Sequence, residues 1–337
     1  MKLLKTEALA RRLIDSGIVS NLAIRVGRRD EVLAEVYTRG VCDTTLFDMA
    51  SVTKILSVAA LSLIAIDKGL LCVDDAVEKF FEVQPRYKKL MVKHLLTHTM
   101  GIGHKDLTAS GFSYENIEEH ILSLYDSPPG EEVYYSCPAF ILMGRIIERI
   151  YNARLDELFG RMVAAPLGMT RSGFLPKERG FSDIVNSNVD PEKCAEVNDY
   201  NCRYLGGIAG NAGIFSCISD LTLFIRAMLD GGVPLFSRAT LDIAAENHTH
   251  GMSESRGLGF LFVDGRYRQT GKLFREGAIG HCGHTGTSLF FDRESGLYAI
   301  ILSDATVTVT KNYGYNYERV KLMRENIHNA IKEDLNL

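Results

Sequence analysis

Residues 51–66 read SVTKILSVAALSLIAI, an almost uninterrupted apolar run behind Ser51 and Lys54. A helix that begins here places Ser51 in its first turn and Lys54 three residues later, so hydroxyl and amine share one face. The first turn also offers unpaired N–H groups and the positive end of the helix dipole. Because Lys54 is the only charged residue in the stretch, burial would favour its neutral, basic form. The stretch predicts a core helix that can present an activated serine.

A structural interpretation of the same residues stays open, in which Ser51 is an N-cap and Lys54 extends from the start of a core helix. Two other common hydrolase signatures, G-x-S-x-G and H-E-x-x-H, do not occur in the sequence. If the protein is a hydrolase, a lysine-activated serine is the candidate that remains.

Composition limits the classes of partner. The chain has 337 residues, of which 46% are hydrophobic and 24% charged, with a net charge of −4. These values are ordinary for a globular protein of two domains or of one domain with a large insertion. Lysine and arginine are scattered, so we expect no nucleic-acid or membrane partner and a small-molecule substrate instead. The oligomeric state has no signal in the sequence.

The N-terminal residues interrupt their apolar positions with charges, which leaves no signal-peptide core, and the apolar run after Lys54 is too short to span a bilayer. We therefore expect a cytoplasmic protein. Seven widely spaced cysteines without a C-x-x-C pair favour reduced thiols. The cluster from His281 to His284 could suggest a metal, but its glycines and the lack of further ligands argue against one, and we expect no cofactor.

Strand patterns occur at both ends of the chain. A β-hairpin is predicted near the start, helical periodicity prevails from about residue 69 to Gly206, and further strands and a last helix follow. The predicted strands are 22–26, 32–37, 258–263, 278–281, 287–291 and 297–302. We therefore predict an α+β fold, an antiparallel sheet flanked by helices. Residues 1–68 and 209–337 form its sheet domain, and residues 69–208 form an inserted helical domain.

Three short motifs carry the chemistry. Ser51 and Lys54 form a Ser-x-x-Lys motif, Tyr135-Ser136-Cys137 stands just before a predicted helix, and His281-Cys282-Gly283 ends a predicted strand. Together they resemble the Ser-x-x-Lys, Tyr-x-Asn and Lys-Thr-Gly or His-x-Gly motifs of the class C β-lactamase and penicillin-binding-protein superfamily of serine hydrolases. Five further stretches resemble landmarks of that family in the same order, at 69–81, 94–102, 128–137, 165–174 and 206–224.

The resemblance implies a role for each matched residue. Ser51 would be the nucleophile, Lys54 would activate it, and Tyr135 would be the general base in acylation and the acid toward the leaving group. The backbone N–H groups of Ser51 and His284 would form the oxyanion hole. Substrate would be bound by the residues of the second and third motifs, Cys137, His281, Cys282 and Gly283.

Two positions depart from the family pattern. Cys137 stands where the family has an asparagine, and Cys282 stands where it has a threonine. The first change removes an amide that both donates and accepts hydrogen bonds, and the second removes a hydroxyl from the substrate strand. His281 also replaces a permanently charged lysine by a mostly neutral imidazole. These changes weigh more against β-lactam hydrolysis than against acyl transfer.

We therefore expect a serine hydrolase that forms an acyl-enzyme on Ser51 and acts on a small ester, amide or β-lactam, with a carboxylesterase or amidase preferred. A β-lactamase or a D-amino-acid peptidase is the alternative within the superfamily. A catalytically impaired binding or sensor protein is the alternative from another class, motivated by Cys137.

Overall fold

The computed structural model describes residues 2–108 and 114–337. Within these residues, six strands form one antiparallel sheet in the order β2-β1-β8-β7-β6-β5. Their bounds are β1 Leu22–Arg28, β2 Glu31–Tyr37, β5 Leu261–Phe262, β6 Ile279–Cys282, β7 Ser288–Phe291 and β8 Leu297–Ser303. The predicted α+β class and the predicted N-terminal hairpin are confirmed.

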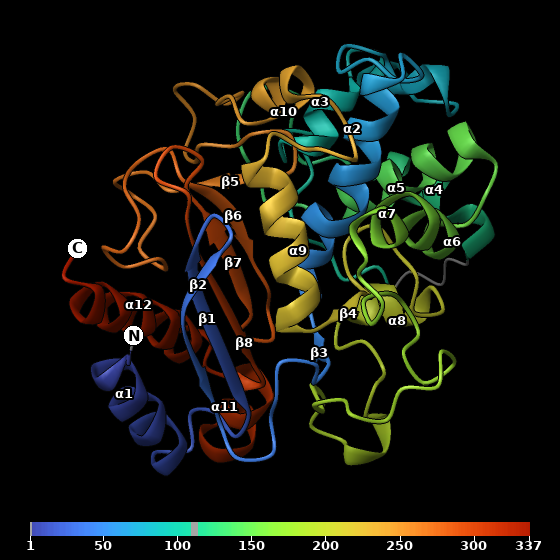
Figure 1. The fold of residues 1–337 in the computed structure, drawn as a ribbon. Helices are drawn as coiled ribbons and strands as arrows, with labels where there is room; N and C mark the ends of the chain where they lie inside the picture. The colour runs from blue at the N-terminus through green and yellow to red at the C-terminus, as the bar shows by residue number, and fades with distance from the viewer. Residues whose placement is uncertain (1, 109–113) are drawn as a thin grey trace.

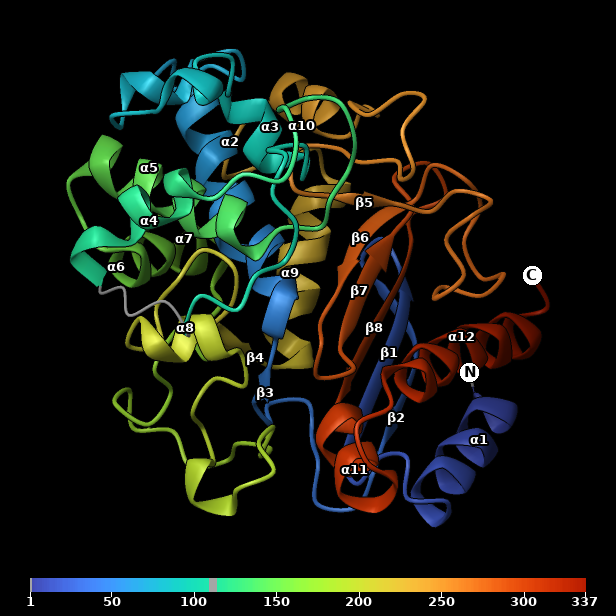
Figure 2. The same ribbon diagram turned by 180° about the vertical axis from the view of Figure 1, so that it is seen from behind.

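Helices cover both faces of this sheet (Figures 1 and 2). Helices α1 (Leu4–Asp15), α11 (Ala305–Tyr313) and α12 (Tyr317–Leu335) lie on one face, and α9 (Ile218–Leu229) lies on the other. Strand β8 serves both cores, because its alternate residues face opposite ways. Tyr298 and Ile300 join the core beneath α9, whereas Ala299 and Ile301 join the core beneath α12.

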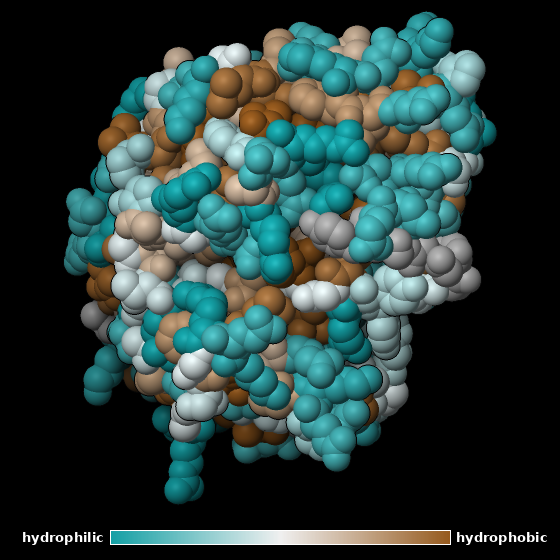
Figure 3. Space-filling view, turned by 90° about the vertical axis from the view of Figure 1, so that its right-hand side faces the viewer, coloured by the Kyte–Doolittle hydropathy of each residue, from teal (hydrophilic) through white to brown (hydrophobic). Residues whose placement is uncertain are grey.

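The chain between the two sheet segments is mainly helical and gathers on one side of the molecule (Figure 1). Its α-helices are α3 Val92–Leu96, α4 Ile117–Ser123, α5 Cys137–Tyr151, α6 Leu155–Phe159, α7 Ala165–Leu167 and α8 Tyr200–Tyr204. The surface of this side is largely hydrophilic, with smaller apolar patches among the polar residues (Figure 3). The domain bounds at 68 and 208 stay a prediction.

The helix that carries Ser51 changes geometry along its length. A 3-10 turn, Ala50–Val52, leads into a π-helical segment, Lys54–Ala59, and then into α2, Ala60–Asp67. Over Ala50–Asp67 it is long and apolar enough to cross a membrane, which differs from the expectation of too short a run, but 83% of it is buried inside the fold. Such burial is typical of a core helix.

A two-residue ladder pairs β3 (Phe47–Asp48) with β4 (Phe215–Ser216), and it was not anticipated from the sequence. It joins the segment before Ser51 to the chain that returns from the helical side. The short α10 (Arg238–Ala244) packs against α2. Single helical turns complete the described chain, at Val77–Lys79, Pro85–Tyr87, Tyr114–Asn116, Gly160–Ala164 and Pro191–Lys193.

Candidate active site

The three residues predicted to carry the chemistry meet at one point. Lys54 Nζ donates a hydrogen bond to Ser51 Oγ over 2.9 Å, and the Tyr135 hydroxyl donates to the same oxygen over 2.6 Å. Ser51 and Lys54 share one face of the first turns of the core helix, as predicted. Tyr135 arrives from the loop before α5, whose N-cap Ser136 accepts from the Ala139 N–H. The lysine side chain is fully buried, whereas the serine is partly exposed.

The turn that contains Ser51 is fixed by hydrogen bonds to the carboxylate of Asp48. Ala50 has a left-handed backbone with φ of 45°, which is uncommon for a residue other than glycine. Its N–H donates to Asp48 Oδ1 over 2.8 Å. The other carboxylate oxygen of Asp48 accepts from the Asn198 N–H over 2.7 Å and from Ser187 Oγ over 3.0 Å. Asp48 therefore ties the nucleophile turn to the loop before α8.

The turn after β6 packs directly against the same segment. Thr285 Oγ1 donates to the Asp48 carbonyl over 2.9 Å, and Thr287 Oγ1 donates to the Met49 carbonyl over 3.3 Å. A side chain at Gly283 would meet the Met49 carbonyl at 2.6 Å, so glycine allows the close approach. This packing holds the turn that contains His284 against the segment before Ser51, and the oxyanion hole formed by the N–H groups of Ser51 and His284 stays a prediction.

The charge state of the site differs in one respect from the expectation. Burial by itself lowers the pKa of Lys54, as expected, but its interactions with Cys137 and Tyr135 outweigh burial, and the pKa lies above its usual value. Burial also raises the pKa of Tyr135, against the opposing effect of the Lys54 ammonium. In the resting site the lysine is therefore an ammonium and the tyrosine a neutral phenol.

His281 is the residue before the last in β6 and faces the tyrosine, with 6.2 Å between the two ring centres. Its Nδ1–H donates to the Cys282 carbonyl over 2.7 Å when the ring is neutral, which leaves Nε2 as an acceptor without a partner among the described residues. Burial, together with the charges of Lys54 and Arg256, holds its pKa well below the usual value. The imidazole is therefore neutral across the physiological range, as the sequence suggested.

Of the two cysteines predicted to bind substrate, Cys282 points away from Tyr135 and Cys137 is buried beside Lys54. Cys282 follows His281 on the strand and so points to the opposite face, where its sulfur lies 3.0 Å from the Tyr267 hydroxyl, beside the core under α12. Cys137 is buried, and its sulfur lies 3.6 Å from Lys54 Nζ. It therefore contacts the catalytic lysine. The side chain of His284 stacks on Tyr317, with 4.9 Å between the ring centres.

Other residues at the site were not identified from the sequence. His98, interpreted as structural, packs its ring 4.6 Å from that of Tyr135 and accepts from the Ser136 N–H at Nδ1 over 2.9 Å. The buried Arg256 lies 5.8 Å from the centre of the Tyr135 ring and pairs with Glu254. The only signal for His98 was its place in the stretch 94–102, and no motif marks Arg256.

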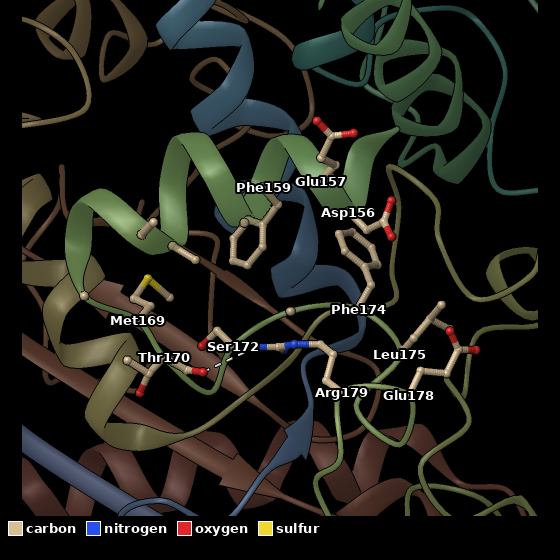
Figure 4. Close-up of a pocket in the computed structure, with 15 residues that line it drawn as sticks. Asp156, Glu157, Phe159, Met169, Thr170, Ser172, Phe174, Leu175, Glu178 and Arg179 are labelled. Carbon is tan, nitrogen blue, oxygen red and sulfur yellow. Dashed lines mark hydrogen bonds between the residues drawn. The ribbon is translucent and has the colours of Figure 1, made fainter. Parts of the chain in front are cut away.

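A separate cavity of about 650 Å³ lies between α6, α7 and the segment that follows them (Figure 4). Phe159, Phe174 and Met169 line it, and the Arg179 guanidinium donates to the Thr170 carbonyl over 3.4 Å. None of its lining residues belongs to the group around Ser51. Among the described residues there is also no cluster of three or more side chains that could hold a metal ion.

A helix-borne serine and lysine, a tyrosine from the helical side and a strand-end turn, set on this sheet, define the class of the penicillin-binding-protein-like serine hydrolases. The chain belongs to the Beta-lactamase family, whose model matches residues 6–321.

Known proteins agree with this assignment. An Escherichia coli K12 protein, provisionally named a D-alanyl-D-alanine carboxypeptidase, is 26% identical over 302 residues, which cover 77% of this chain and 69% of the relative. A Mycobacterium bovis β-lactamase has a similar structure, with a TM-score of 0.69, 18% identity and coverage of 97% of this chain and 100% of that one. The structure of EstCE1, a hydrolase with promiscuous acyltransferase activity, is also similar, with a TM-score of 0.74 and 19% identity. The match covers 96% of this chain and 98% of that one.

Proposed function

We propose that this protein is a serine hydrolase that forms an acyl-enzyme on Ser51 and acts on small neutral esters in preference to β-lactams. The observation that carries the proposal is the shared hydrogen bonding of Ser51 Oγ, which accepts from both Lys54 and Tyr135. Two groups that can exchange protons, an amine and a phenol, are thus in direct contact with the serine oxygen, as nucleophilic catalysis requires.

Acylation begins when the Lys54–Tyr135 pair has lost one proton. Tyr135 then takes the proton of the Ser51 hydroxyl as Oγ bonds to the substrate carbonyl carbon. The oxyanion that forms is stabilised by the N–H groups of Ser51 and His284, a contribution of about 3 kcal/mol per donor in comparable sites. Tyr135 gives the proton to the leaving alkoxide, and the C–O bond to the alcohol breaks.

Deacylation repeats these steps with water. Tyr135 accepts a proton from a water molecule as the water oxygen attacks the acyl carbon. The bond from that carbon to Ser51 Oγ then breaks, and Tyr135 returns the proton to the serine. The Lys54 ammonium lies 5.1 Å from the centre of the tyrosine ring, where it stabilises phenolate character throughout the cycle. One ester and one water are consumed, and one acid and one alcohol are formed, so the steps balance without a cofactor.

The preference for esters rests on His281 and Cys137. The neutral imidazole offers no permanent charge to a substrate carboxylate, and Cys137 offers no amide. A fluorophosphonate probe followed by mass spectrometry tests the mechanism, since labelling is expected on Ser51. Turnover of a nitrophenyl acetate, a chromogenic cephalosporin and a D-alanyl-D-alanine peptide then tests the preference. Hydrolysis of the cephalosporin at the rate of the ester would contradict it.

A D-amino-acid peptidase is the second candidate, favoured by the name of the relatives that are 26% identical. The D-alanyl-D-alanine peptide in the same panel separates the two. We also propose a cytoplasmic location, because all seven cysteines are free thiols, as is usual in a reducing compartment. Fractionation of cells that express the whole natural chain tests it.

A further inference from the structure

Asn211 lies in the loop between α8 and β4 and is fully buried on the far side of Lys54. Its backbone carbonyl accepts a hydrogen bond from Lys54 Nζ over 3.0 Å. The ammonium therefore has one hydrogen bond toward Ser51 Oγ and one toward this loop. Whatever fixes the position of Asn211 also fixes the direction in which Lys54 points.

The side chain of Asn211 is held by Asp199. Nδ2 donates to Asp199 Oδ1 over 2.9 Å, and the same oxygen accepts from the Cys202 N–H over 2.8 Å at the N-cap of α8. Asn211 Oδ1 is buried and has no partner among the described residues. A buried amide with an unpaired oxygen is costly unless it serves the site.

The sulfur of Cys137 is a third neighbour of the lysine ammonium. It lies 3.6 Å from Lys54 Nζ, and the Asn211 side chain hydrogen-bonds toward it, which opposes the rise that burial causes in the pKa of the thiol. A thiol accepts hydrogen bonds weakly, so Cys137 alone holds an ammonium less well than an amide does. The second amide nearby therefore lies where the family pattern has lost one.

We propose that Asn211, anchored by Asp199, is a positioning residue that takes over the role of the amide missing at Cys137 and directs Lys54 toward Ser51. The inference rests on the proposed function. Asp199 adds a negative charge that helps to raise the pKa of Lys54, after the larger effects of burial, Cys137 and Tyr135. The pair therefore orients the lysine and favours its charged form.

Asn211→Ala tests the role directly, because alanine keeps the backbone carbonyl that Lys54 contacts and removes only the amide. We expect a loss of about tenfold in kcat on a nitrophenyl ester, with KM changed less than twofold. Cys137→Asn in the Asn211→Ala background should restore at least half of the lost kcat. A folding defect would not be rescued in this way.

Asn201→Ala is the matched control, since Asn201 is also a buried asparagine, in α8, whose side chain binds the Lys105 carbonyl and the Leu107 N–H and no atom of the Ser51 site among the described residues. It should lower the Tm without changing kcat or the pH profile. Asp199→Asn keeps a residue that can cap α8 but removes the negative charge that raises the pKa of Lys54. The rising part of the pH–rate profile should therefore move to lower pH by at least about 0.3 pH unit.

The rate of fluorophosphonate labelling at Ser51 separates the two proposals. If the wild-type protein is not labelled, the proposed function fails and the positioning role fails with it. If the wild type is labelled and Asn211→Ala is labelled and turns over at the same rate, the positioning role alone is wrong. Loss of activity that Cys137→Asn does not restore also overturns it.

Discussion

The Tyr135 hydroxyl lies 2.6 Å from Ser51 Oγ, although 84 residues separate the two in the chain. Helix α5 makes this contact possible, because Ser136 caps it and fixes the loop from which the tyrosine extends. His98 supports the same loop from the other side through its bond to the Ser136 N–H. The proposed nucleophile and its proposed base therefore come from the core helix and from the loop before α5.

Ser51→Ala should abolish ester turnover, with a loss of at least about 10³-fold, and leave the Tm within about 2 °C of the wild type, because the hydroxyl makes no other contact that the fold requires. Lys54→Ala should cost nearly as much, and the double variant no more than either one. Steady-state rates and thermal unfolding of all three proteins check this. Additive losses would show that the two residues do not act as a unit.

The rate should rise with pH across the neutral range. The raised pKa values of Lys54 and Tyr135 mean that the catalytic form, one proton short, is the minor species at pH 7. The value of kcat/KM for a neutral ester should therefore increase about tenfold per pH unit until the pair ionises. Stopped assays between about pH 6 and pH 10, corrected for spontaneous hydrolysis, measure it. A flat profile from pH 7 to 9 would refute the assignment of charge.

Asp48 should make stability depend on pH. Burial raises its pKa to about 6, against the opposing hydrogen bonds from Asn198, Ala50 and Ser187. Because the folded pKa exceeds the unfolded value, this contribution to stability is complete below about pH 4 and is lost as pH rises through 6. A difference of about 2 in pKa corresponds to about 3 kcal/mol. Urea unfolding at several pH values should show the slope, and Asp48→Asn should remove it.

Arg256→Met should make two buried imidazoles easier to protonate. Burial is the main reason that the pKa values of His98 and His281 are low, and Arg256 lowers both further. Removing its positive charge should therefore raise both pKa values, which NMR titration of the imidazole C–H signals detects. The variant should also lose rate, because one of two cations beside the Tyr135 ring is gone. Arg154→Met, at an exposed arginine on the helical side, is the control.

The parts of the fold that could be predicted from the sequence are those in which apolar residues repeat with a clear local spacing. The hairpin of β1 and β2 and strands β6 to β8 alternate or run apolar, and each was found within a few residues of its predicted bounds. Helix α11 contains the run TVTVT at 306–310, whose β-branched alternation is typical of a strand. Its helical form depends on packing against α12, which no local pattern encodes.

The same division holds at the site. Ser51, Lys54, Tyr135 and His281 belong to short motifs, so their meeting was predictable. Arg256 enters through folding alone, from a segment that no motif marks, and Asn211 lies in the stretch 206–224, where the resemblance assigned it no role. Cys282 was placed in the cleft because strand pairing was not yet known. Its position next to His281 means that only one of the two can face the tyrosine.

The pairing of β1 with β8, Leu22 opposite Ser303, has a consequence for synthesis on the ribosome. The hairpin of β1 and β2 emerges early, but its inner edge has no partner until nearly the whole chain has been made. An apolar strand with an open edge invites pairing with another nascent chain. We therefore expect a chain truncated before residue 297 to aggregate, because β1 would lack its inner partner.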